Sequence, residues 1–467
     1  MSRAKYAVRF LPLAVAAVLV LVAVFVSPAT RSTARPPANV AVTQTTLACP
    51  LLESANDVAL GQAVARSDAK TAAELRPGSS KIAGLTGNPG WLQQRLKPDG
   101  LASAVIRRVD PDGAGTVAFT SGVASAKLGG GLSLEQCSGA RPESWFVGAG
   151  STTRHFSTLR LTNLGDSRAV VDVKLFGVDG AVEVPKGKGI VLEAQEVRSI
   201  DLASIASGEN ELAVEVVAQR GAVASSMLDS STSVFRGTDW NGSSASPSRD
   251  VTISGISAGA PGRTLLLANP GDDSATVSVN VVSAKGTAVL EGLNDVNVSA
   301  GSVKAVDLPQ TIGADPVSLR LVSSAPLTAS VRSSPTNVDF SYAAATEPLS
   351  GPSVVPLTLG KTFGASNVRI MAVPASTSVA TTVVLEAFDS SLRSLGTTKV
   401  DLPAGETTTI NPAKPGLFSS DAPAFIVLTP SAPAIAGMTV TAGSQITALP
   451  LRDAPLEVLA PSVFSNG

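Results

Sequence analysis

The stretch LLLANPGDDSATVSVNVV, residues 265–282, decides the fold of this chain. It joins an apolar run to a second run, in which apolar and small polar side chains alternate, through a turn of Asn-Pro-Gly-Asp-Asp. Alternation with a period of two is typical of a strand with one buried face, and Asn, Pro, Gly and Asp favour tight turns. The stretch therefore predicts two successive strands joined by a turn.

Two other parts of the chain repeat this pattern at offsets of about a hundred residues. Each copy also has an entry strand before it, a short alternating run that ends in Ile-Asp-Leu, Val-Asp-Leu or Ile-Asn-Pro, and a late pair of strands. A unit of about a hundred residues with short alternating runs and frequent turns is typical of an immunoglobulin-like antiparallel β-sandwich. The sequence therefore predicts an all-β chain with three tandem sandwiches: residues 142–246 (repeat 1), 247–351 (repeat 2) and 352–460 (repeat 3).

Residues 46–141 (the N-terminal module) are predicted to be a membrane-proximal module of mostly β structure, with a patch near residues 57–75 that also suits a helix. The module contains the two cysteines of the chain, Cys49 and Cys137. In an exported protein an isolated pair is expected to form a disulfide, which here closes a long loop and stabilises by about 4–5 kcal/mol. Lipid attachment at Cys49 and a two-cysteine metal site are the weaker alternatives, because the apolar segment is distant and histidine partners are missing.

The N-terminus has the features of a membrane-targeting segment. Three cations within residues 1–9 precede the unbroken apolar run Phe10–Val26. This run is long enough to cross a hydrocarbon core of about 30 Å, whereas the apolar part of a cleaved signal peptide usually has about 7–15 residues. We expect a single transmembrane anchor, with cleavage near Ser27–Ala29 as the alternative. The positive-inside rule then places the N-terminus in the cytoplasm and the bulk of the chain outside the cell.

The remaining segments follow from these assignments. The stretch after the anchor is rich in Pro, Thr and Arg, a composition that favours a tether over a core element. The expected order is a basic tail (1–9), the anchor (10–29), a flexible linker (30–45), the N-terminal module, the three repeats and a C-terminal tail (461–467).

Residues able to perform catalysis are few. The only histidine of the sequence is His155, and neither a second histidine nor a nucleophile-elbow sequence accompanies it. The paired acids Asp110 with Asp112 and Asp272 with Asp273 lie in Pro- and Gly-rich stretches, where acids favour turns. We therefore expect no catalytic residue, no metal ligand and no bound cofactor.

Charge and aromatic content restrict the possible partners. The net charge is −1, so the chain lacks the basic field that nucleic-acid binding requires. Three tryptophans and two tyrosines leave few aromatic rings to stack on sugars. Trp240, in a Gly- and Ser-rich loop, is expected either to be exposed as a contact site or to pack between domains.

The chain also resembles a known family. A short N-terminal anchor, ESWFVGAG (143–150) just after Cys137, and TLRLTNLGDSRAVVDVKLFGVDG (158–180) resemble the domain of unknown function 5719 proteins, an uncharacterised actinobacterial envelope family. The resemblance covers most of the expected exported part. It implies the exported cell envelope of an actinobacterium as the setting, and it carries over no catalytic residue because the family has no assigned activity.

These observations are interpreted as a non-enzymatic, membrane-anchored envelope protein. Its tandem sandwiches, as a rod or as a compact group, would act as a structural or interaction scaffold for an envelope protein or a glycan. The alternative is a carbohydrate-binding or enzyme-accessory protein that uses the loops at one end of a sandwich, with Trp240 as its anchor. A third hypothesis places a catalytic site in the N-terminal module, with Asp110 and Asp112 as the candidate acids.

Overall fold

A computed structural model of the chain confirms the all-β class. The residues that it describes form antiparallel strands and single-turn 3₁₀ helices. No helix in these residues is long and apolar enough to span a membrane, and the expected anchor at 10–29 lies outside them. The described residues are 38–63, 74–77, 91–97, 103–109, 113–233, 235–258, 262–312, 315–335, 337–419 and 423–460.

Contacts divide the chain into two units, and the larger one comprises residues Val42–Leu456. In the smaller unit, β1 (Ala38–Ala41) pairs antiparallel with β34 (Glu457–Ala460). The expected flexible linker at 30–45 is therefore wrong for residues 38–41, and repeat 3 ends before β34. The alternating sequence of β1 finds a partner strand only at the distant C-terminal end of the chain, which local composition does not reveal.

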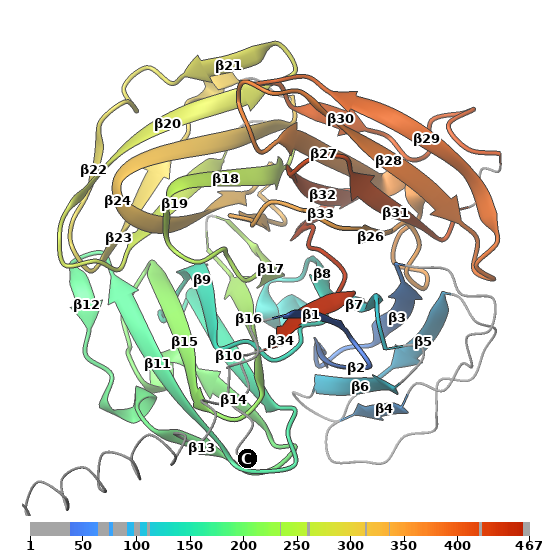
Figure 1. The fold of residues 1–467 in the computed structure, drawn as a ribbon. Helices are drawn as coiled ribbons and strands as arrows, with labels where there is room; N and C mark the ends of the chain where they lie inside the picture. Colours follow the sequence, from blue (N-terminus) through green and yellow to red (C-terminus); the bar gives the residue numbers. More distant parts are fainter. Residues whose placement is uncertain are drawn as a thin grey trace, which may run out of the picture. The chain divides into compact units, whose positions relative to one another are not determined.

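Repeat 1 folds as two antiparallel sheets around one apolar core (Figure 1). One sheet has the order β12-β11-β15-β9, with β13 beside β11, and the other has the order β14-β10-β16-β17. The alternating strand β11 turns Val171, Val173 and Leu175 into the core, as the sequence predicts. Its elements are β9 (Glu143–Ala149), β10 (His155–Asn163), β11 (Ala169–Gly177), β12 (Gly180–Val182), η2 (Pro185–Gly187), β13 (Ile190–Leu192), β14 (Val197–Asp201), η3 (Leu202–Ser204), β15 (Leu212–Arg220), β16 (Val223–Ser231) and β17 (Gly237–Asn241).

Repeat 2 has the same strand order, but its two sheets are joined because the 17-residue strand β24 pairs in both. One part of β24 lies between β18 and β20, and the other between β19 and β25. Its elements are β18 (Ser248–Ile256), β19 (Arg263–Asn269), β20 (Ala275–Ser283), β21 (Gly286–Val289), β22 (Val296–Val298), β23 (Ser302–Asp307), η4 (Gln310–Ile312), β24 (Val317–Ser333) and β25 (Ser341–Ala344).

Repeat 3 again has two sheets, with the orders β26-β31-β28-β29 and β30-β27-β32-β33. Its elements are β26 (Ser353–Pro356), η5 (Ala365–Asn367), β27 (Val368–Pro374), β28 (Thr381–Phe388), β29 (Ser394–Leu402), β30 (Thr408–Ile410), β31 (Phe425–Pro430), β32 (Ala434–Ala442) and β33 (Gln445–Pro450).

The N-terminal module follows the same plan, with sheets β2-β6-β4 and β5-β3-β7-β8. It is therefore a fourth, divergent copy of the unit. The helix considered near 57–75 is wrong for its first part, because residues 56–62 form β3, which lies between β5 and β7. Its elements are β2 (Gln44–Pro50), β3 (Asn56–Gln62), β4 (Glu74–Pro77), β5 (Leu92–Leu96), β6 (Ser103–Val109), β7 (Thr116–Val123), η1 (Ala126–Leu128) and β8 (Leu132–Gln136).

The predicted disulfide is confirmed. Cys49 on β2 is bonded to Cys137, which directly follows β8. These strands belong to different sheets of the module, so the bond joins the two sheets across a core that both cysteines help to form.

Each module buries apolar side chains against two others. Trp91 of the N-terminal module stacks on Phe425 of repeat 3, with ring centroids 5.1 Å apart. Leu52 of the same module packs with Trp240 of repeat 1. The Trp145 side chain of repeat 1 forms a cluster with residues of repeat 2.

Within residues 42–456, the contacts between modules form a closed cycle, because the first and the last module also touch. Repeats 1 and 2 share the cluster around Trp145, and repeats 2 and 3 share one made by Val282, Val373 and Ile435. The last strands of the modules also meet, because β8 contacts β17 and β33, and β25 contacts the same two strands. The repeats thus form a compact group with the N-terminal module, and the rod arrangement is wrong.

Candidate functional site

The single histidine lies buried where repeats 1 and 2 meet. His155 begins β10 and is 5% exposed. Its Nδ1 lies 2.6 Å from the carbonyl oxygen of Asn210, and its Nε2 lies 3.1 Å from both carboxylate oxygens of Asp229. Both neighbours are acceptors, so both ring nitrogens donate and the ring is held as imidazolium. Burial alone lowers the pKa of His155, but the charge of Asp229 and the hydrogen bond to it outweigh burial and raise the pKa.

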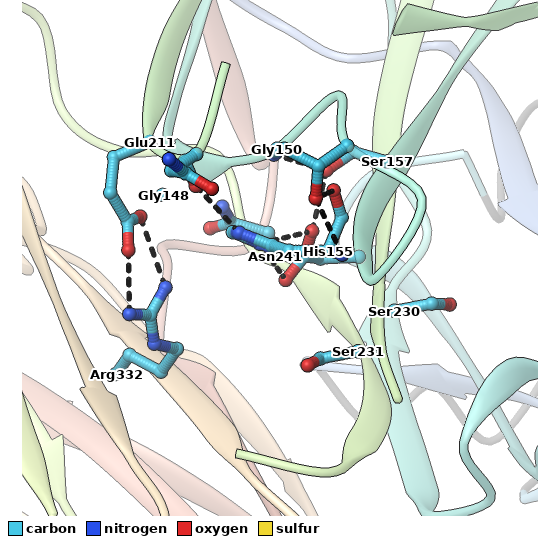
Figure 2. A network of polar contacts seen from close by, with 12 residues as sticks. Gly148, Gly150, His155, Ser157, Glu211, Ser230, Ser231, Asn241 and Arg332 are labelled. Atoms are coloured by element: carbon cyan, nitrogen blue, oxygen red, sulfur yellow. Dashed lines mark hydrogen bonds and ion pairs between the residues drawn. The ribbon is translucent and has the colours of Figure 1, made fainter. Parts of the chain in front are cut away.

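Figure 2 shows the polar contacts of His155 and Ser157. Asp229 on β16 is the centre of this network, since both side chains bind it. It is fully buried, and it accepts a 2.5 Å hydrogen bond from Ser157 Oγ. Tyr342 Oη, from repeat 2, lies 2.8 Å from Asp229 and 2.6 Å from the carbonyl oxygen of Gly148. Three donors from two repeats therefore surround one carboxylate, as a buried charge requires.

An ion pair extends the same network. Arg332 of repeat 2 holds Glu211 of repeat 1 through two hydrogen bonds of 2.7 and 3.0 Å, visible beside the histidine in Figure 2. The guanidinium also lies 3.7 Å from the ring centroid of Phe235. Bidentate geometry and a cation–π contact are the arrangements in which arginine binds most specifically.

The hydrogen bonds of this cluster interlock two repeats and do not have the arrangement of a catalytic triad. In a hydrolytic triad the histidine lies between serine and acid, whereas here the acid Asp229 lies between Ser157 and His155. The serine hydroxyl donates to the acid and is fully buried, so it is neither activated nor open to a substrate. The network therefore joins repeat 1 to repeat 2.

A second polar cluster lies along the last strands of the modules. Asp339, just before β25, accepts hydrogen bonds from the backbone N–H groups of Leu132, Ile446 and Phe340 at 2.9–3.0 Å. Leu132 begins β8 and Ile446 lies in β33. One carboxyl group of repeat 2 thus binds the last strands of the N-terminal module and of repeat 3.

Asp239 has the matching place in repeat 1. It accepts from Thr447 Oγ1 of repeat 3 at 2.8 Å, and its second oxygen is buried without a partner. Burial and the nearby Asp339 hold the pKa of Asp239 well above its usual range. Burial also raises the pKa of Glu135 on β8 to about 7 and that of Asp339 to about 7. These carboxyl groups resist ionisation where the modules meet.

The other sequence candidates fall in different places. Trp240 is 1% exposed and stacks under the Arg160 guanidinium, 5.4 Å from it. The prediction of an exposed contact residue is therefore wrong, because Trp240 packs between modules instead. Asp272 and Asp273 are exposed in the turn after β19, where the backbone of Asp273 accepts from Asn269. Asp110 and Asp112 lie outside the described residues.

Among the described residues, no group of three or more His, Cys, Asp or Glu side chains is placed to hold a metal ion.

Three cavities lie at loops in the described part of the chain. One cavity of about 660 Å³ lies at an end of repeat 1, lined by hydroxyl side chains, Phe156 and Asp201. Another, of about 210 Å³, lies among the segments that leave the last strands, and a third of about 230 Å³ lies next to it.

Comparison with known proteins identifies a family but no activity. The model of a family of unknown function, DUF5719, matches residues 97–413, which is more than half of the chain. The chain belongs to the DUF5719 family. No curated protein matches this DUF5719 chain. The match runs from the end of β5 past β30, so it includes the two interlocking clusters almost completely.

Apart from His155, the sequence of this DUF5719 protein does not identify the interlocking residues. A signal for two of them exists, because GTDWN (237–241) and NVDFSY (337–342) both place an aspartate before an aromatic residue late in a repeat. Each of these aspartates accepts from the backbone N–H of the aromatic residue that follows. Nothing comparable marks Asp229 or Arg332, whose partners lie about a hundred residues away.

Proposed function

We propose that this chain is a non-enzymatic, exported cell-envelope protein that acts as a structural or interaction scaffold. In this proposal residues 10–29 anchor it in the cell membrane, the N-terminus is cytoplasmic, and the modules are immunoglobulin-like sandwiches outside the cell. An oxidising compartment suits the disulfide of Cys49 and Cys137.

The observation that carries the proposal is that the buried polar side chains bind other parts of the same chain. His155, Asp229, Arg332 and Asp339 all bind residues of other strands or other modules. These bonds and the apolar clusters between modules hold the four modules in fixed contact. A rigid body of this kind presents loops at constant positions, as a scaffold for partners requires.

A pull-down of the tagged full-length chain from crosslinked native cells tests this function. The expected result is one envelope protein recovered in stoichiometric amount, with the chain at full length in the membrane fraction. A variant that lacks residues 1–29 should leave that fraction. Recovery of neither a protein nor a glycan would contradict the scaffold, and a soluble full-length chain would contradict the anchor.

The second candidate function is carbohydrate binding, and the cavity at the end of repeat 1 favours it. Phe156, Asp201 and the hydroxyls of Ser151, Thr152 and Ser207 line this space of about 660 Å³. An aromatic ring that stacks on a sugar, beside a carboxylate and hydroxyls that bind its hydroxyl groups, is a suitable lining for a glycan.

A glycan array separates the two functions. If the second function holds, the full chain binds a defined glycan, and Phe156→Ala and Asp201→Asn both weaken that binding. Asp179→Asn is the matched control, because Asp179 is exposed in a turn of the same repeat and does not line the cavity. Equal binding by the three variants would exclude this cavity as the glycan site.

A further inference from the structure

Four segments of the chain converge on one cavity of about 210 Å³, which we call the exit cavity. Each segment directly follows the last strand of a module. The N-terminal module contributes Arg141, repeat 1 contributes residues 243–245, repeat 2 contributes residues 345–349, and repeat 3 contributes Arg452 and Asp453. The space exists only because the four modules meet.

Two arginines from the first and the last module line the exit cavity. Arg452 donates one hydrogen bond, to the carbonyl oxygen of Ser243, which leaves most of its five N–H donors unassigned. The Arg141 side chain makes no hydrogen bond or ion pair with the described residues. Burial and the positive charge of Arg141 lower the pKa of Arg452, and the charge of Glu135 raises it by less, so a further anion between the two guanidinium groups is favourable.

A buried hydroxyl group faces the same space. Ser243 is 7% exposed, and its Oγ has no hydrogen-bond partner. A buried hydroxyl without a partner costs free energy, and in native proteins such a group calls for a bound water, ion or ligand. Ser243 lines the exit cavity together with both arginines.

The acidic groups around the cavity leave this site open. Asp453 accepts from the backbone N–H groups of Ser350 and Gly351, so it is already partnered. Glu347 is exposed at the rim. Glu135 does not line the cavity. Its charge acts on both arginines, but burial raises its pKa to about 7 and its Oε2 makes no hydrogen bond.

The geometry points to an anion-binding site: the exit cavity takes a small oxyanion, a carboxylate or a phosphate group, between Arg141, Arg452 and the Ser243 hydroxyl. Guanidinium groups bind both classes through paired N–H donors, and a hydroxyl completes the coordination. The volume corresponds to about seven water molecules at roughly 30 Å³ each, so an oxyanion group fits inside while a larger ligand extends past Glu347 into solvent. This site is independent of the scaffold function.

Isothermal titration of the purified full-length chain tests the site, with inorganic phosphate and succinate as separate probes. At least one of them should bind with one-to-one stoichiometry. Arg141→Gln should weaken this binding about tenfold through the loss of a charge-assisted hydrogen bond. Arg220→Gln is the matched control, because Arg220 is exposed, makes no side-chain bond in the described residues and does not line the cavity.

Ser243→Ala gives a readout that a purely structural role would not produce. Without an anion the variant should melt at the same temperature as the parent chain or higher, because the substitution removes a buried hydroxyl that has no partner. With the anion it should bind several times more weakly. Binding of phosphate alone or succinate alone would identify the class of oxyanion. The proposal is overturned if neither probe binds, or if Arg141→Gln and Arg220→Gln bind equally well.

Discussion

Asn163 and Asn269 occupy matching places in repeats 1 and 2 and make matching hydrogen bonds. The side-chain amide of Asn269 donates to the carbonyl oxygens of Asp273 and Ser299 at 2.8 and 3.1 Å, and its Oδ1 accepts from Gly271 at 3.1 Å. Asn163 binds the corresponding backbone atoms of repeat 1. The asparagine in the repeated turn is thus a buried clamp that ties the end of one strand to two loops.

Replacing this clamp should cost stability. Asn269→Ala leaves one buried and several partly buried backbone groups without this partner, so we expect the free energy of unfolding to fall by about 1–2 kcal/mol. Urea unfolding followed by circular dichroism measures it. Asn297→Ala, at an exposed position of the same repeat, should change it by less than about 0.5 kcal/mol. Similar losses in the two variants would contradict the clamp.

Trp240 supplies the second test at this scale. Because its ring is buried between Leu52, Ala124 and Leu228, Trp240→Ala should destabilise the chain by about 3–5 kcal/mol. Thermal melting measures the effect, with Val178→Ala as the control at a position that is 52% exposed. A Trp240→Ala variant with unchanged melting would mean that the ring is at the surface, as a contact residue would be.

At the scale of elements, the last strands of the four modules are held by carboxyl groups. Asp339 binds β8 and β33, and Asp239 binds β33 through Thr447. A Gly-rich turn, residues 129–131, allows β8 to approach β17, since all three glycines have positive φ angles and a side chain at Gly129 would collide with the backbone of Gly237. Each of these strands pairs with its own sheet along one edge only, so contacts between modules also position them.

The buried acids predict a stability that falls as pH rises. In the folded chain Glu135 and Asp339 keep a proton up to a pKa of about 7, whereas unfolded carboxyl groups lose it near about 4. The folded chain therefore holds more protons between these pH values, and its stabilisation is lost as pH rises to about 7. His155, whose pKa is also raised, acts in the same direction, because its contribution is present below about pH 6.5 and is lost at higher pH.

Melting temperatures at about pH 5.5 and pH 8 measure this dependence. We expect the lower melting temperature at pH 8, with about 2 kcal/mol of the lost stability due to Glu135 alone. Glu135→Gln removes one titrating group and should reduce the difference between the two temperatures. A melting temperature that is unchanged or higher at pH 8 would mean that these carboxyl groups are ionised in the folded chain.

At the scale of the whole molecule, residues 42–456 form one compact unit in which each module packs against two neighbours. The N-terminal module contacts repeat 3 through polar bonds as well as through Trp91. Thr362 donates to Asp57 at 3.0 Å, and the indole N–H of Trp91 donates to the carbonyl oxygen of Thr358 at 3.0 Å. Interfaces that are this apolar and this well bonded couple the modules in unfolding.

We therefore expect a single unfolding transition in scanning calorimetry rather than one transition for each module. Trp91→Ala removes the stacking between the first and the last module, so it should lower the melting temperature or split the transition. Val289→Ala, at a side chain that is 54% exposed, should leave one transition unchanged. Several transitions in the parent chain would show that the modules unfold independently.

The sequence by itself determined the all-β class, the three repeats, the turn chemistry and the disulfide. These features depend on local patterns: alternation with a period of two fixes strands, and Asn, Pro and Gly fix turns. A lone pair of cysteines leaves only one possible partner for each. The N-terminal module escaped recognition as a fourth copy, because its strands keep the order of the unit but not its motifs.

Only the tertiary structure decided how the modules pack and what the polar residues do. Whether Trp240 is exposed depends on a surface formed by Leu52 and Ala124, far away in the chain. Likewise, Asp229 and Tyr342 are separated by 113 residues, and Arg141 and Arg452 meet only at the exit cavity. The physical reason is that a strand pattern specifies which face is buried, whereas the element that covers that face is chosen by packing between distant segments.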